Sequence, residues 1–220
     1  MDSDLDDSSL GSDLEDEFLG AVIIHEFEKS TFDRHDFLPH DRIDKLITRP
    51  SVAHALNIDL TRNLASGDES LLNFILQSAK RVFAIILTCN FRGHDLRRVM
   101  ETFKRKHFED KALPVTSDVL AELDCFNKKP WSAMERRLFF REQWAFLAPV
   151  FSSDNFKMDL EPDHILPFIL VDQDTKSGSF NQVFHATIHP AHWTNPVLTV
   201  RAPPSFPPFS PSGRAAFDTS

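Results

Sequence analysis

Residues 70–89 have the sequence SLLNFILQSAKRVFAIILTC, in which apolar side chains recur every three to four positions. This spacing is the period of an α-helix and places the apolar groups on one broad face. The face consists of Leu71, Leu72, Ile75, Ala79, Val82, Phe83 and Ile86. Residues 82–87 are apolar nearly all round. We therefore expect residues 70–89 to form one helix that is the central buried helix of the fold.

Helical patterns continue on both sides of this stretch. Residues 94–108 are predicted to be amphipathic, with Leu96, Val99, Met100 and Phe103 facing inward and a solvated basic stripe of Arg97, Arg98, Lys104 and Lys106 facing outward. Ser132 and Glu135 have capping-box spacing and predict a helix that carries Met134, Leu138, Phe139, Trp144, Phe146 and Leu147 and ends at Pro149. Shorter helices are expected over residues 18–27, 42–48 (stopped by Pro50), 51–56 (capped by Ser51) and 118–123. Together, residues 18–163 are expected to form a small helical bundle.

Composition narrows the class of protein. The 220 residues contain 24 Lys and Arg against 33 Asp and Glu, so the formal net charge is −9. This argues against a nucleic-acid partner, and no apolar run approaches the roughly 20 residues that span a bilayer. The two cysteines, Cys89 and Cys125, form no framework of disulfides. We expect a soluble, intracellular protein, cytoplasmic or nuclear, without a membrane partner.

Both ends of the chain differ from its middle. Residues 1–17 contain eight of the acids and no base, and residues 194–220 contain six prolines. An acidic segment repels itself, and proline removes backbone donors. We expect an acidic disordered tail at residues 1–17 and a proline-rich disordered tail at residues 194–220.

After residue 163 the pattern changes from helix to strand. Residues 165–171 are continuously apolar, and residues 180–189 are rich in β-branched and aromatic side chains. Residues 172–179 between them are turn-prone. The sequence therefore predicts a β-hairpin, which alone is marginal in water and must pack on the helices or join a larger sheet.

The segment between these strands has the sequence KSGSFNQV at residues 176–183. It resembles the glycine-rich loop of protein kinases, GxGxxGxV, with Lys176 and Asn181 in place of two glycines. Flanking segments at 141–151, 166–168 and 188–190 resemble kinase-like proteins of filamentous fungi over residues 18–192. The resemblance implies that residues 164–193 are the first two strands of a kinase N-lobe. The residues that would contact ATP are Gly178, Ser179, Phe180, Asn181 and Val183.

The resemblance does not extend to catalysis. A kinase needs a third-strand lysine, a catalytic-loop aspartate and a magnesium-binding aspartate. Lys176 is the last lysine here, and neither an HRD nor a DFG sequence occurs. We interpret the chain as a truncated kinase-like protein without catalytic residues, cofactor or bound metal; a full-length relative would be a Ser/Thr kinase that uses ATP and Mg. The alternative is a non-catalytic helical module that binds a protein partner whose identity the sequence does not give.

Other polar clusters have simpler interpretations. His185 and His189 would lie about 13 Å apart on one strand face, too far for one metal ion. The acids Asp33, Asp36 and Asp41, together with His35 and His40, are expected to be solvated surface. Cys89, Trp131 and Trp144 are expected to pack in the core.

Overall fold

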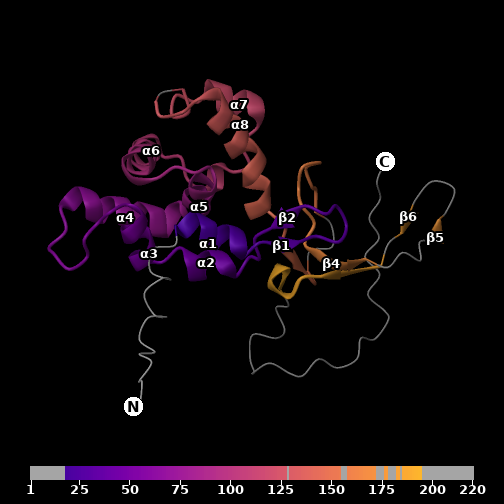
Figure 1. Cartoon of the computed structure of the whole chain (residues 1–220). Coiled ribbons are helices and arrows are strands. Elements are labelled where there is room, and N and C mark those ends of the chain that lie inside the picture. The colour runs from indigo at the N-terminus through magenta and orange to yellow at the C-terminus, as the bar shows by residue number, and fades with distance from the viewer. Residues whose placement is uncertain are drawn as a thin grey trace, which may run out of the picture.

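The computed structural model describes residues 18–127, 129–154, 158–171, 176–177, 182–183 and 185–194. The fold is mainly helical, with only small two-stranded sheets, as the sequence predicts (Figure 1). The segments predicted to be disordered tails, apart from Thr194, lie outside the described residues.

The helices lie in the first two thirds of the chain and the longer strands in the last third. The α-helices are α1 (Leu19–His25), α2 (Arg42–Leu46), α3 (Arg49–Ala55), α4 (Ser66–Ser78), α5 (Lys80–Thr88), α6 (Gly93–Lys106), α7 (Ser117–Glu122) and α8 (Ala133–Glu142). The 3₁₀ turns are η1 (Asp110–Ala112), η2 (Gln143–Phe146) and η3 (Pro190–His192). The strands are β1 (Glu28–Lys29), β2 (Asp36–Phe37), β3 (Phe151–Ser152), β4 (Phe168–Val171), β5 (Lys176–Ser177), β6 (Gln182–Val183), β7 (Ala186–Ile188) and β8 (Trp193–Thr194).

Helix α5 is the centre of the core, as predicted for residues 82–87. All six of these side chains are buried, and α5 contacts α1, α2, α4, α6, α8, η1 and η2. Figure 1 places α5 among the other helices of the bundle. Gly20 lets α1 approach closely, because a Cβ at this position would lie 2.8 Å from the carbonyl oxygen of Leu87.

The single helix predicted over residues 70–89 is wrong. The chain bends by 99° between α4 and α5, at Ala79, whose φ of −141° is not helical. The bend leaves the first backbone N–H groups of α5 without helical partners. The side chain of Asp110 accepts hydrogen bonds from two of them: Oδ2 from the Arg81 N–H at 3.1 Å and Oδ1 from the Val82 N–H at 2.9 Å. A carboxylate distant in sequence therefore caps α5, which no periodicity could indicate.

Asp110 reaches α5 because α6 ends sharply. His107, in the left-handed conformation with φ 55°, closes α6, and the chain turns back through η1. Burial raises the pKa of the Asp110 carboxyl above its usual value, although the backbone N–H donors oppose this shift. The cap is therefore held in a partly desolvated position.

In the described part of the chain, no single helix is long and apolar enough to cross a membrane. Helices α4 and α5 together have the length and composition, but they are bent by 99°.

Local capping signals are partly as predicted. The Ser132 capping box is present, with Glu135 accepting from the Ser132 N–H at 2.7 Å. Pro50, however, lies in the first turn of α3 instead of stopping a helix, and the cap is Thr48, not Ser51. Proline fits the first helical turn because its missing N–H would have no helical partner there.

Aromatic side chains fill the space between α6 and α8. Phe103, Phe126, Trp131 and Phe139 lie with ring centroids 4.7–6.2 Å apart. Trp131 and Trp144 are buried, as predicted.

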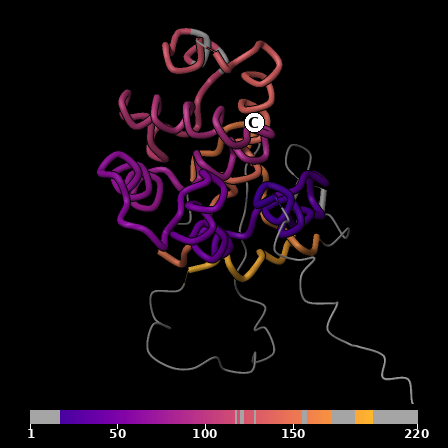
Figure 2. The backbone as a smooth tube through the Cα atoms, turned by 60° about the vertical axis from the view of Figure 1, so that its left-hand side comes forward, coloured from indigo at the N-terminus to yellow at the C-terminus, as the bar shows by residue number. Residues whose placement is uncertain are grey.

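The strands form short pairs. β4 pairs antiparallel with β7, and β5 with β6, so a β-hairpin spans residues 168–188. β5, at Lys176 and Ser177, lies within residues predicted as loop. β1 and β2 are antiparallel, whereas β3 and β8 are parallel. Figure 2, turned by 60°, shows the residues of β7, η3 and β8 in yellow along the lower side of the helical part.

Asp110→Ala should lower the free energy of unfolding by about 1–2 kcal/mol, because it leaves two N–H groups of α5 without an acceptor. Asp124→Ala is the matched control: Asp124 forms an exposed ion pair with Lys106 at 3.2 Å, worth under about 1 kcal/mol. Urea unfolding of both variants measures the difference. Equal losses would contradict the capping role.

Candidate functional site

We call residues 164–194 the hairpin segment. The helical region meets this segment at a cluster of three histidines. His40 follows β2, His189 precedes η3, and His192 is the last residue of η3. Ring centroids of His189 and His192 lie 5.9 Å apart, and Phe37 of β2 lies edge-on to both. We call His40, His189 and His192 the histidine junction.

His192 is the buried centre of this junction. Its side chain is 1% exposed, and each ring nitrogen has a backbone partner 3.0 Å away: Nε2 accepts from the His40 N–H, and Nδ1 faces the carbonyl oxygen of Pro149. Only the neutral ring with its proton on Nδ1 satisfies both contacts. Burial lowers the pKa of His192 to about 4, and the neighbouring histidines add to the shift, while the Pro149 carbonyl opposes it. His192 therefore joins three chain segments only while neutral.

His189 is oriented by two contacts. Its Nδ1 accepts from the Ala191 N–H at 3.1 Å, which assigns the proton to Nε2. Nε2 lies 3.2 Å from the carboxylate of Glu28 in β1. His189 thus links η3 to the helical region.

His40 is exposed, as predicted for solvated surface, but it also contacts other segments of the chain. Its N–H binds His192, and its Nδ1 lies 3.3 Å from Nη2 of Arg81. Burial is the main cause that lowers the pKa of His40, and the charge of Arg81 lowers it further. Asp33 likewise accepts from the Leu166 N–H at 3.4 Å. The predicted polar surface is therefore part of the contact between segments.

Backbone contacts extend the junction on both sides. The carbonyl oxygen of Phe168 accepts from the N–H and from Oγ1 of Thr31, at 2.8 and 2.9 Å. On the other side β8 pairs with β3, and Oγ1 of Thr194 donates to the carbonyl oxygen of Phe151 at 3.2 Å. The hairpin segment is thus attached to the helical region near both of its ends.

The geometry favours positioning over catalysis at the junction. Both ring nitrogens of His192 are already occupied by backbone groups, which removes them as metal ligands. Among the described residues, no group of three His, Cys, Asp or Glu side chains has the geometry to hold a metal ion.

The residues predicted to contact ATP are not brought into a described site. Gly178, Ser179, Phe180 and Asn181 lie outside the described residues. Val183 belongs to β6, opposite Lys176, and only its backbone is described. The junction was missed because its contacts join residues 43 to 161 positions apart. One local signal existed: His189 precedes Pro190 and caps η3.

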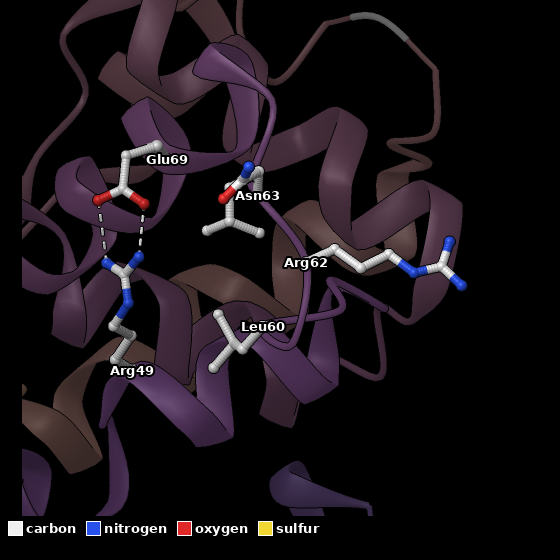
Figure 3. A pocket seen from close by; sticks show the side chains of 6 residues that line it. Arg49, Leu60, Arg62, Asn63 and Glu69 are labelled. Carbon is white, nitrogen blue, oxygen red and sulfur yellow. Dashed lines mark hydrogen bonds and ion pairs between the residues drawn. The ribbon is translucent and has the colours of Figure 1, made fainter.

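A separate pocket of about 490 Å³ lies between α3, the following loop and α4. Figure 3 shows Arg49 and Glu69 facing each other at its edge, while Arg62 points away. The Arg49 guanidinium makes two bonds to Glu69, at 3.1 and 2.5 Å, and Arg62 pairs with Asp59 at 3.1 Å. The two arginines that line this pocket are therefore already paired with carboxylates.

The cysteines are buried and inert. Burial raises the pKa of both thiols, that of Cys125 to about 11. Neither thiol is a nucleophile at neutral pH.

Comparisons with protein-family models, with curated proteins and with solved structures found no match to this chain.

Stability should fall as pH decreases from 6.5 toward 4. Over this interval the unfolded chain binds a proton on residue 192 that the folded chain excludes, which costs at most about 1.4 kcal/mol per pH unit. His192→Asn should flatten this dependence, whereas His94→Asn, at a side chain that is 85% exposed, should preserve it. Urea unfolding at several pH values measures each slope. Identical slopes in wild type and His192→Asn would refute the assignment.

Proposed function

We propose that this chain is a protein kinase-like protein whose helical region, residues 18–163, holds the first two strands of a kinase-like N-lobe, residues 164–193, in a fixed position. The kinase assignment is supported by the sequence KSGSFNQV and its flanking segments. The positioning role is supported by the histidine junction. The buried neutral His192 is the observation that carries the proposal, because its ring contacts two distant parts of the helical region at once, at His40 and at Pro149.

The side chains of β4 differ in exposure along the strand in a way that fits this role. Phe168 is buried, and its ring lies 6.2 Å from that of Phe151 and 6.0 Å from that of Phe32. Leu170 is 62% exposed, and Ile169 and Trp193 are also exposed. Uncovered apolar side chains on a two-stranded sheet mark a surface that further strands would cover. In the proposed function, those strands are the rest of a kinase-like N-lobe.

The chain as given carries no phosphoryl-transfer machinery in this proposal. The lysine that would hold the α- and β-phosphates follows the second strand in kinases, and no lysine follows Lys176 here. ATP and Mg would belong to a relative that has the later motifs. The chain itself then corresponds to the N-terminal helical region and the first two N-lobe strands of such a protein.

A second candidate is a non-catalytic module whose helical region binds a protein partner. The same exposed residues, Ile169, Leu170 and Trp193, favour it, because a partner could cover them instead of kinase strands. The two candidates differ in what lies beyond the hairpin in the gene. Sequencing the messenger RNA across and beyond codon 190 separates them. A reading frame that continues into a lysine-bearing strand and HRD and DFG segments supports a protein kinase, whereas a transcript that stops as given excludes kinase function and leaves the helical module as the candidate.

The 220-residue chain should show no change in melting temperature with Mg-ATP and no transfer of phosphate to a general substrate such as casein. A competent site would be stabilised by about 2.7 kcal/mol at one hundred times its dissociation constant. Differential scanning fluorimetry measures the shift, and Mg-GTP and ATP without metal are the controls. A rise specific to Mg-ATP would contradict the predicted inactivity.

Attachment of β4 is tested by substitutions at one buried and one exposed side chain of this strand. Phe168→Ala should lower the free energy of unfolding by about 3–5 kcal/mol, because it removes a buried ring. Leu170→Ala should change the same quantity by less than about 0.5 kcal/mol, because the side chain is exposed. Urea unfolding compares the two. If Phe168→Ala cost no more than Leu170→Ala, the hairpin would not be docked on the helical region.

A further inference from the structure

A small pocket lies between α6 and the segment that leads into α8, on a part of the molecule that the histidine junction does not include. Its volume is about 90 Å³. It is lined by Arg98, Val99, Thr102, Arg105, Cys125, Lys129, Pro130 and Trp131. A water molecule occupies roughly 30 Å³ in the liquid, so the pocket has room for a few waters or one small ion, not a nucleotide.

The charge in this pocket is uncompensated. Three of the lining residues, Arg98, Arg105 and Lys129, are bases, and none is an acid. Within the described part of the chain, none of the three forms an ion pair with a carboxylate. The neighbouring bases are different: Arg97 pairs with Asp68 at 2.6 Å, and Lys106 pairs with Asp124 at 3.2 Å.

Two neutral residues with polar side chains, Thr102 and Trp131, also line the pocket. The Thr102 hydroxyl donates to the carbonyl oxygen of Arg98 at 2.8 Å and accepts from Nη2 of Arg105 at 3.3 Å, which orients that guanidinium. Nε1–H of Trp131 is buried and has no acceptor in the described part of the chain. The pocket thus gathers positive charge and donors from two chain segments.

We infer that this pocket binds a phosphate group, with Arg98, Arg105 and Lys129 as its ligands. Guanidinium groups match the tetrahedral oxygens of phosphate with paired N–H donors, and lysine adds a point charge. The volume admits one phosphate, either as the free ion or at the end of a phosphorylated side chain. The basic stripe predicted to be solvated surface is, at Arg98, part of a binding site.

The test uses the full chain at constant ionic strength, titrated with inorganic phosphate, with a phosphoserine peptide and with the same peptide unphosphorylated. Binding is followed by calorimetry and by the tryptophan fluorescence of the chain, to which Trp131 in the pocket contributes. We expect saturable binding of a phosphate-bearing probe, and at least a tenfold weaker affinity for Arg98→Gln and for Lys129→Gln. Both side chains are exposed, so the variants should fold as the wild type does.

Lys104→Gln is the matched control, because it removes the same charge from α6 at a residue that does not line the pocket. It should change the affinity less than twofold. Inorganic phosphate binding as tightly as the phosphopeptide assigns the free ion, whereas a tighter phosphopeptide assigns a phosphorylated side chain; both support the site. The proposal is overturned if no phosphate probe binds at about 10 mM, if chloride competes equally, or if Lys104→Gln weakens binding as much as Arg98→Gln.

Discussion

Burial of residues 82–87 in α5 is the constraint on which the rest of the structure depends. A helical stretch whose side chains are apolar nearly all round must be covered on every side, and α1, α2, α4, α6 and α8 supply that cover. Its first N–H groups are then remote from water and need an internal acceptor. Asp110 provides it, which fixes the bend at Ala79 and the return of the chain after α6. The arrangement of the bundle thus follows from one hydrophobic segment and one polar group.

The same bundle presents the surface on which the hairpin segment docks. Residues 27–41 and 145–152 emerge from the helices side by side, since Leu38 N–H donates to the Ala145 carbonyl at 2.7 Å. His192 inserts beside them and satisfies one backbone donor and one acceptor. The imidazole of His192 makes directional hydrogen bonds that an apolar ring could not make. Protonating this buried ring costs free energy, because burial disfavours its charged form. In the proposed function, this geometry sets the position of the first kinase-like strands.

Much of the fold could be predicted from the sequence because it depends on local periodicity. The burial of residues 82–87, the inward face of α6 and the Ser132 capping box are all encoded within a few turns of chain. The bend at Ala79 could not be predicted, since its acceptor lies about 30 residues away at Asp110. The histidine junction could not be predicted from the sequence for the same reason. His40 and His192 are 152 positions apart, and nothing local distinguishes a docking histidine from a solvated one.

The measurement that tests this account most directly is a titration of His192 followed by nuclear magnetic resonance of its ring nitrogens. The account predicts a pKa near 4 and, at neutral pH, a single neutral tautomer with its proton on Nδ1. A pKa near the ordinary value of about 6.5, with the proton shared between the two nitrogens, would mean that the ring is solvated. The hairpin segment would then not be docked on the helical region, and the positioning role would fail.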